Sequence, residues 1–238
     1  MKTRIPAALS AVVTIAVLGS LCACASRAPK DGLGEVQDLS ARIEGVQRSV
    51  DAAKARVEAA VKSLHAIAAF NFEDDPADAY AGFVATVDAS VAQVAALRAS
   101  VASMQEAAEP LFRKWEEHLE TFASEEIRQR SRERQAETRS RYEAIVSAAE
   151  SALLAYDAFN RTLNDHVAYL RFDFNAASLA VIQGEVARLQ QTAALLDTQF
   201  KSCQIAARVY VEAAALPRTI PAPKPDAAPA AEPARSGR

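Results

Sequence analysis

Glycine, aromatic residues and cysteine are all scarce in this sequence, and each scarcity narrows the class of protein. Only seven of the 238 residues are glycine and 6% are aromatic, whereas half of the chain is hydrophobic, much of it alanine. This composition is typical of long helices and not of a β-sheet. Of the three cysteines, Cys22 and Cys24 lie close to the N-terminus, which leaves Cys203 alone in the body of the chain. An intramolecular disulfide framework is therefore excluded.

Sequence motifs for catalysis, nucleotide hydrolysis and metal binding are also missing. The chain has no G-x-x-x-x-G-K-[ST] loop, no G-x-S-x-G, and no Cys or Ser with an identifiable His partner. It has no His-Glu-x-x-His, no Glu-x-x-His of the di-iron bundles and no calcium loop with its Gly. His65 and His166 fall near several acidic residues at one end of the predicted bundle, and a small-ligand or metal-binding bundle is one alternative. We predict a non-enzyme without catalytic residues, metal ligands or a cofactor.

The charge of the chain is weakly acidic, with a formal net charge of −3 at pH 7. This balance includes two basic residues at the start, Lys2 and Arg4, and a basic tail beyond residue 216. Without these segments the formal charge of residues 24–216 is about −7, and such a body repels nucleic acid. We therefore expect no nucleic-acid partner.

The N-terminus has the pattern of a lipoprotein signal peptide over residues 1–23. Lys2 and Arg4 precede an apolar run that is too short and too early for a permanent transmembrane helix. The run ends in Leu21-Cys22-Ala23-Cys24, which resembles a bacterial lipobox with Cys24 as the lipidated residue. Ordinary cleavage after Ala25, which would give a secreted protein, is the alternative. We expect a cell-envelope protein held at the membrane by this lipid. With no Asp after Cys24, the prediction is the outer membrane, facing the periplasm, in a Gram-negative organism.

Hydrophobic residues at alternating 3-4 spacing predict a helical bundle over residues 35–215. The first seam runs from Val36 to Ile67, after a tether over 24–34. We expect a second helix over about 77–122, with a seam through Val84, Val87, Val91 and Val94 and with Leu97, Met104 and Leu111 widening it. Pro110 lies inside this helix and is expected to kink or divide it. Ser124 and Asn175 are predicted to cap the third and fourth helices, whose seams run from Tyr142 to Leu170 and from Leu179 to Tyr210.

Short connections between four long helices predict an all-α fold, a long antiparallel up-down-up-down four-helix bundle or coiled coil. Counting residues along the antiparallel helices leaves about ten residues per arm of the central hairpin, roughly 113–134, without neighbours. We therefore expect a hairpin that protrudes by about 15 Å at the end where the first helix begins. The segment 216–238 is rich in Pro and Ala and is predicted to be disordered.

The tip of the predicted hairpin is the most strongly charged part of the chain. Six arginines lie between residues 128 and 141, with only Glu133 and Glu137 among them. One interpretation is a docking surface for anionic headgroups or an acidic partner. The other is a solvated helical end, because Glu126 and Glu137 are each four residues before an arginine, and acidic residues 116, 117 and 120 face this region across the hairpin. The candidate interaction residues are Trp115, Arg128, Arg130, Arg132, Arg134 and Arg139.

Three stretches of the chain resemble one bacterial family: LFRKWEEHLETF, RQRSRERQAETRSRYEAI and LNDHVAYLRFDFNAASLAVIQGEV. On these stretches the sequence is similar to the domain of unknown function 2959, over about residues 30–215. The similarity is strongest at Leu111-Phe112 with Trp115, at Ser131 and at Arg141-Tyr142. The sequence departs from the family at 170–175, where the family tends to have Leu-Lys-His-Asn-Leu-Asn. The resemblance implies an export or lipoprotein signal and a helical body, and it brings no assigned activity.

From these patterns we expect a lipid-anchored, non-catalytic envelope protein that acts as a structural or adaptor module with a protein partner. Two alternatives remain open at this stage. One is a membrane-surface module that uses the Arg-rich tip. The other is the small-ligand or metal-binding bundle.

Overall fold

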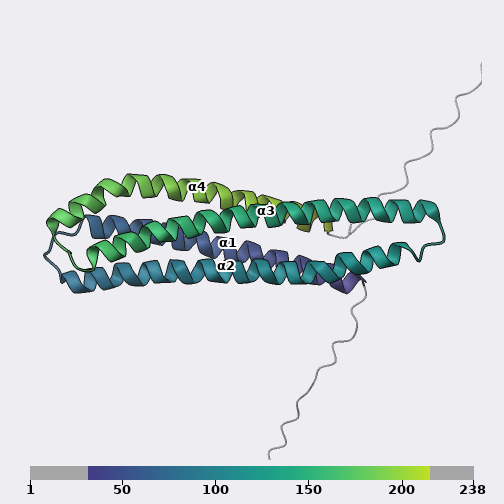
Figure 1. Ribbon diagram of the computed structural model, residues 1–238, viewed down its shortest axis with the longest axis horizontal. Helices are drawn as coiled ribbons and strands as arrows, with labels where there is room; N and C mark the ends of the chain where they lie inside the picture. The colour runs from purple at the N-terminus through teal and green to yellow at the C-terminus, as the bar shows by residue number, and fades with distance from the viewer. Residues whose placement is uncertain (1–31, 215–238) are drawn as a thin grey trace, which may run out of the picture. The chain divides into compact units, whose positions relative to one another are not determined.

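The computed structural model describes residues 32–214, which form four long helices joined by short turns (Figure 1). The predicted signal peptide, the lipidation site Cys24 and the Pro/Ala-rich tail lie outside these residues. No strand occurs within this range, and the predicted all-α bundle is confirmed. The helices are α1 (Gly32–Ala68), α2 (Pro76–Leu119), α3 (Glu125–Leu170) and α4 (Ala176–Ala214).

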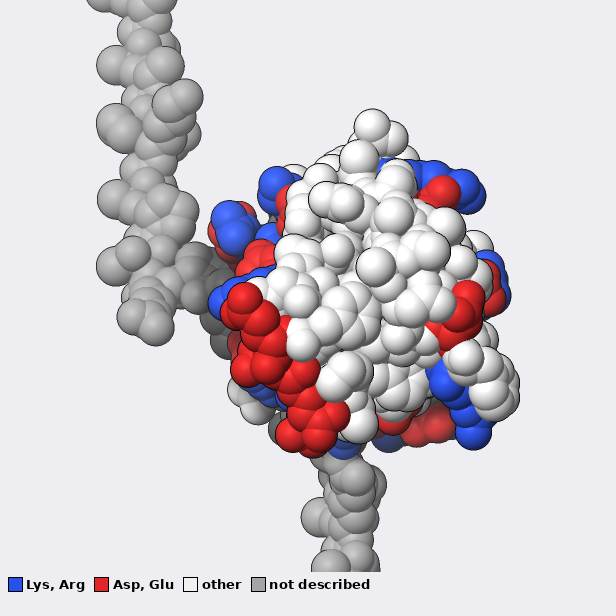
Figure 2. All heavy atoms as spheres, turned by 90° about the vertical axis from the view of Figure 1, so that its left-hand side faces the viewer, with Lys and Arg blue, Asp and Glu red and all other residues white. Residues whose placement is uncertain are grey.

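Each helix packs against its neighbours in sequence, and α4 also packs against α1, so the four form a closed ring. Short turns make consecutive helices antiparallel, as in other up-down-up-down bundles. The α1–α2 and α3–α4 turns lie together at the end that faces the viewer in Figure 2. The α2–α3 turn lies at the opposite end, where α1 begins and α4 ends.

Side-chain caps define the starts of three helices. The Asp75 carboxylate accepts a hydrogen bond from the Ala77 backbone N–H at 2.8 Å. Pro76 follows in the first turn of α2, where a backbone N–H would have no partner within the helix, so proline loses no hydrogen bond there. Ser124 caps α3 through the Ile127 N–H at 3.4 Å, as predicted. The Asn175 side-chain oxygen accepts hydrogen bonds from the backbone N–H groups of Ala177 and Ser178, at 2.9 and 3.1 Å, so the second predicted cap is also present.

Pro110 does not divide α2, which is one helix from Pro76 to Leu119 (Figure 1). A proline inside a helix removes one backbone hydrogen bond and crowds the preceding turn. The next two residues, Leu111 and Phe112, are buried against the rest of the bundle, and this packing keeps the helix continuous. By length and composition α2 is the one described helix that meets the requirements for crossing a membrane, as core helices of bundles also do. Its buried seam faces the bundle core and packs against α1 and α3.

The phase of the α2 seam differs from the prediction. Val91 is 39% exposed and Val84 is only partly buried, whereas Phe83 and Ser90 lie in the core. The buried positions follow one strict heptad pattern in which residues 97, 104 and 111 are central instead of peripheral. Alanine and valine occur on every face of α2, so the sequence supports two phases, and packing against α1 and α3 selects one of them.

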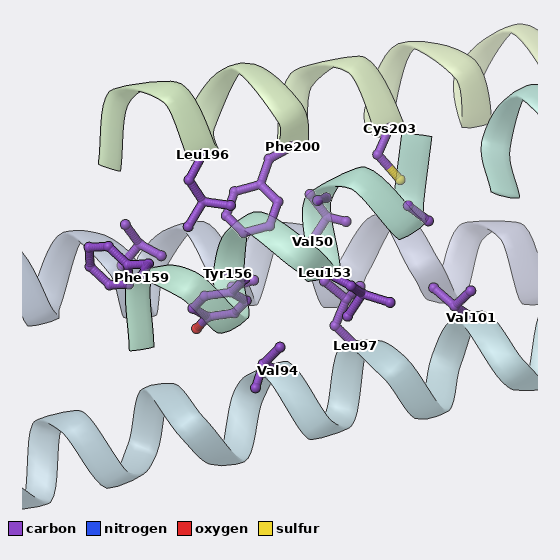
Figure 3. Packing of buried hydrophobic residues seen from close by; sticks show 14 of the residues in the cluster. Val50, Val94, Leu97, Val101, Leu153, Tyr156, Phe159, Leu196, Phe200 and Cys203 are labelled. Atoms are coloured by element: carbon purple, nitrogen blue, oxygen red, sulfur yellow. The ribbon is translucent and has the colours of Figure 1, made fainter. Parts of the chain in front are cut away.

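The core runs the length of the bundle and takes side chains from all four helices, as Figure 3 shows around Leu97, Tyr156 and Phe200. The rings of Tyr156 and Phe200 meet edge to face, with centroids 5.6 Å apart. Cys203 is buried beside them, as expected, and burial raises the pKa of its thiol to about 11. The thiol is therefore protonated and unreactive at neutral pH.

A buried polar layer interrupts the apolar core between α2 and α3. Ser90 Oγ lies 2.7 Å from Asn160 Oδ1 and 3.1 Å from Tyr156 Oη, and all three residues are buried. The Asn160 amide also donates to the Ser90 carbonyl at 3.4 Å. One hydroxyl donates only one hydrogen, so Ser90 donates to Asn160 and Tyr156 donates to Ser90. This layer sets the register of α2 against α3, because a shift along the helix leaves these groups unpaired.

Candidate interaction sites at the two ends of the bundle

The central hairpin extends beyond the other two helices, as predicted (Figure 1). Two contacts mark the level at which the four-helix core ends. Lys114 on α2 forms an ion pair with Glu35 in the first turn of α1. Arg134 on α3 donates to the Ala213 carbonyl at the end of α4, at 3.3 Å. Slightly beyond Lys114, Trp115 and His118 of α2 still line a hollow with Leu33 of α1, and past this hollow the two arms of the hairpin extend beyond the described parts of the other helices (Figure 1).

The start of α1 lies at Gly32, three residues before the predicted boundary. Leu33 and Val36 line a hollow with Trp115 on α2, and this contact extends the helix towards the hairpin. Helical structure therefore reaches into the predicted 24–34 tether. Glycine is a weak helix former, so tertiary contact and not propensity explains the early start.

A set of contacts between α2 and α3, which we call the clasp, holds the base of the hairpin. Trp115 Nε1 donates to Ser131 Oγ at 3.0 Å, and the buried Gln135 amide donates to the Phe112 carbonyl at 3.2 Å. The rings of Phe112 and Tyr142 lie 5.6 Å apart. The Arg139 guanidinium sits 4.6 Å above the Phe112 ring, a cation–π contact. Trp115 and Arg139, both predicted interaction residues, are thus part of the structural contact between the two arms.

The arginines of the tip have partners within the hairpin. Arg128 donates to the Phe122 carbonyl at 2.6 Å and to Glu125 at 2.8 Å, and so ties the turn to α3. Arg130 pairs with Glu126 at 3.1 Å. Arg132 forms no ion pair among the described residues and donates to the uncharged Gln129 side chain at 3.3 Å.

The predicted i,i+4 pairs are both present, since Arg141 also meets Glu137 at 3.2 Å. In the part of the chain that the structure describes, no ion pair joins the acidic residues 116, 117 and 120 to α3, contrary to expectation. The arginines find nearer carboxylates on their own helix. Exposed ion pairs of this kind contribute a few tenths of a kcal/mol each to stability. They therefore give each arginine a partner without holding its side chain rigidly.

A buried charge that the sequence does not predict lies at the base of the hairpin. Glu35 is only 8% exposed and lines a hollow of about 490 Å³ between the start of α1 and α2. Its Oε1 pairs with Lys114, whereas Oε2 is buried and has no hydrogen-bond partner among residues 32–214. On the α3–α4 side, the buried Tyr210 hydroxyl likewise has no hydrogen-bond partner in the part of the chain that the structure describes. The only signal in the sequence is that Glu35 directly precedes the first apolar seam, which is too common a position to single it out.

The residues proposed as part of an alternative metal site do not come together. Within residues 32–214 no group of three or more potential ligands is placed to hold a metal ion. His65 instead contacts Gln190 at 2.6 Å beside a groove of about 500 Å³ between α1 and α4. His166 is buried on α3, and burial lowers the pKa of its imidazole.

Aromatic side chains gather at the end opposite the hairpin. Phe70 and Phe72 follow α1, and Phe174 precedes α4, with the three ring centroids 5.1 to 5.8 Å apart. Tyr80 on α2 joins them at 6.3 Å from Phe174. Next to this group, Phe172 is 90% exposed. Figure 2 shows this end as a broad uncharged surface with acidic side chains along one side.

Comparison with known proteins supports the resemblance seen in the sequence. Residues 30–213 match the family described as "Protein of unknown function (DUF2959)". No curated protein and no solved structure matches the chain. The stretches that suggested the resemblance contain the clasp, since Trp115 meets Ser131 and Phe112 meets Tyr142. This match covers all four helices except the last residue of α4, and the chain therefore belongs to the DUF2959 family.

Proposed function

We propose that this protein is a lipid-anchored, non-catalytic component of the cell envelope that acts as a structural spacer or adaptor. The observation that carries the proposal is a continuous core between two chemically different ends. The hairpin end is rich in paired arginines, and the opposite end exposes aromatic rings. At 1.5 Å per residue the 44 residues of α2 span about 66 Å, so the two ends stand far apart.

The position of the proposed anchor determines which end of the bundle lies near the membrane. Gly32 begins α1 at the hairpin end, eight positions after Cys24. Such a segment reaches at most about 28 Å when fully extended. Lipid on Cys24 therefore keeps the hairpin end near the membrane and leaves the aromatic end tens of ångströms away. In a Gram-negative cell we propose the outer membrane as this surface, with the bundle in the periplasm.

The partners of the arginines bear on the proposed role of the tip. Arg128, Arg130 and Arg141 are already paired, so binding to anionic lipid headgroups would exchange existing contacts for new ones. Arg132 contacts only an uncharged side chain among the described residues, so a partner's carboxylate could bind it without breaking an ion pair. We therefore favour a protein adaptor over a module that binds the membrane surface through its tip.

Lipid attachment is tested by metabolic labelling with radioactive palmitate. The wild-type protein and the control variants Cys22→Ser and Cys203→Ser should incorporate the label, and Cys24→Ser should not. Cys22→Ser distinguishes the two possible lipobox registers, because both cysteines lie in the same short stretch. An unmodified N-terminus in the mass spectrum of the mature wild-type protein would rule out the anchor.

The adaptor role is tested by in-cell photo-crosslinking from position 132 at the tip. A specific crosslinked protein is expected, and its yield should fall when Arg128, Arg130 and Arg134 are replaced by Glu. The matched control is charge reversal at Arg48 and Arg188, which are 72% and 77% exposed on the sides of the bundle. Equal crosslinking in both variants would show that the tip does not contact the partner.

A further inference from the structure

The aromatic end exposes more apolar surface than a folded bundle requires. Phe172 is 90% exposed, Tyr169 42% and Phe72 39%, and Val181 on the first turns of α4 is 55% exposed. The Arg171 guanidinium lies 5.6 Å from the centre of the Phe172 ring, but it covers only part of one face. Single exposed apolar residues are ordinary, whereas a contiguous patch of them is typical of an interaction surface.

The backbone at Phe72 indicates that the aromatic rings are held in place. Phe72 has φ 62°, the one positive value among the non-glycine residues that the structure describes. Residues other than glycine rarely adopt this backbone conformation, because the Cβ atom crowds the backbone. The ring is nevertheless kept against Phe70 and Phe174 at the edge of the exposed surface. Backbone strain of this kind is concentrated at functional sites, and here it lies in a turn that also keeps an aromatic ring partly exposed.

An acidic rim borders the aromatic surface. Glu73, Asp74, Asp75 and Asp78 follow one another around the α1–α2 turn, and all four are exposed. Three of them line a groove of about 580 Å³ whose floor is apolar, with Ile67 and Phe83 among its residues. Within residues 32–214 none of the four carboxylates pairs with a basic side chain. The surface thus combines exposed rings with carboxylates that form no ion pair among the described residues, and acidic side chains gather along one side of this end in Figure 2.

We propose that this aromatic end is a docking surface for a protein segment in which apolar side chains stand next to Lys or Arg. The apolar side chains would cover the exposed rings, and the basic groups would neutralise the acidic rim. Two other occupants, a second copy of this chain and an anionic membrane, are disfavoured because their charges do not complement the acidic rim. A second copy would bring two acidic rims together, and an anionic membrane would repel the same carboxylates.

This inference names the partner class of the proposed adaptor and to that extent rests on the proposed function. Its chemistry does not involve the lipid or the hairpin. A binding measurement on the purified protein therefore separates the two, because loss of lipid attachment leaves the aromatic end unchanged.

The test is binding of three fluorescent synthetic peptides of equal length, followed by fluorescence anisotropy. One peptide alternates Lys with Leu and Phe, the second replaces Lys by Glu, and the third keeps Lys but replaces Leu and Phe by Ser. We expect measurable binding of the first peptide alone, and weaker binding as the salt concentration rises. Equal binding of the first two peptides would overturn the proposal.

Matched variants locate the binding site on the surface. Phe172→Ala should weaken binding of the first peptide by about tenfold or more, since a central aromatic contributes most to a small interface. Leu195→Ala, which removes another side chain with 70% exposure, should leave binding unchanged. The pair Glu73→Gln and Asp74→Asn should weaken binding, whereas Glu116→Gln with Glu117→Gln at the opposite end should not. Neither residue of the first pair caps a helix, so the fold is retained.

Two further measurements test whether a membrane or a second copy of the chain binds the aromatic end instead. Phe172-dependent sedimentation with vesicles of anionic phospholipid would overturn the proposal in favour of a membrane contact. A concentration-dependent dimer that Phe172→Ala dissociates, measured by analytical ultracentrifugation, would overturn it in favour of a second copy.

Discussion

The polar layer of Ser90, Tyr156 and Asn160 allows a sharp prediction about what sets the register of α2 and α3. Replacing Ser90 by Ala removes the hydroxyl that both other side chains use. Burial raises the pKa of Tyr156, so its hydroxyl stays protonated and keeps its need for an acceptor. In the variant, Asn160 Oδ1 and Tyr156 Oη are both buried without a partner.

The expected cost follows from these two losses. A buried polar group that loses its partner costs about 1–3 kcal/mol, and solvent does not reach this layer, since Ser90 and Tyr156 are 0% exposed. The Asn160 amide keeps its bond to the Ser90 carbonyl, which limits the damage. We therefore expect Ser90→Ala to lower the free energy of unfolding by about 2–3 kcal/mol. For a domain of this size the melting temperature should fall by roughly 4–12 °C.

The control replaces the whole layer by apolar groups of similar shape, as Ser90→Ala, Tyr156→Phe and Asn160→Leu. No polar group is then left without a partner, so this triple variant should lie within about 1 kcal/mol of the wild type. Urea unfolding followed by far-UV circular dichroism measures both variants. A Ser90→Ala change below about 0.5 kcal/mol, or a triple variant less stable than the single one, would refute the assigned hydrogen bonds.

Four other predictions concern single positions. Pro110→Ala should raise the free energy of unfolding by about 1–3 kcal/mol in the same urea assay, because the helix is continuous there; a loss would show that the proline is required. Cys203 should resist thiol reagents at neutral pH in the folded protein and react in urea; fast labelling of the native state would contradict its raised pKa. The pKa of His166 is lower in the folded protein than in the unfolded chain, so the unfolded chain binds a proton on this imidazole more tightly. The free energy of unfolding should therefore decrease as the pH falls below 6.5, the ordinary pKa of histidine. His166→Leu should flatten this part of the pH profile. Ser131→Ala should shift the fluorescence of Trp115, the single tryptophan, to longer wavelength and cost about 1 kcal/mol; an unchanged spectrum would mean that the clasp bond is absent in solution.

Much of this fold was predictable because helices are local structures. The seams of α1, α3 and α4 follow from 3-4 spacing, which depends only on helix geometry. The caps at Ser124 and Asn175 depend on side chains that reach backbone groups two or three residues away. The protruding hairpin follows from counting residues along antiparallel helices, since each advances by a constant rise.

What remained beyond prediction involves residues that are far apart in the sequence. The phase of α2 was misjudged because its apolar residues occur on several faces, and only the neighbouring helices decide between them. Glu35 meets Lys114 across 79 residues, and the Ser90 layer joins positions 66 and 70 residues apart. The aromatic end is assembled from two turns that lie about a hundred residues apart in the chain. Sequence periodicity determined which faces of three helices are buried, whereas tertiary packing decided how the helices are aligned and which polar and aromatic side chains meet, because those contacts exist only once the four helices lie side by side.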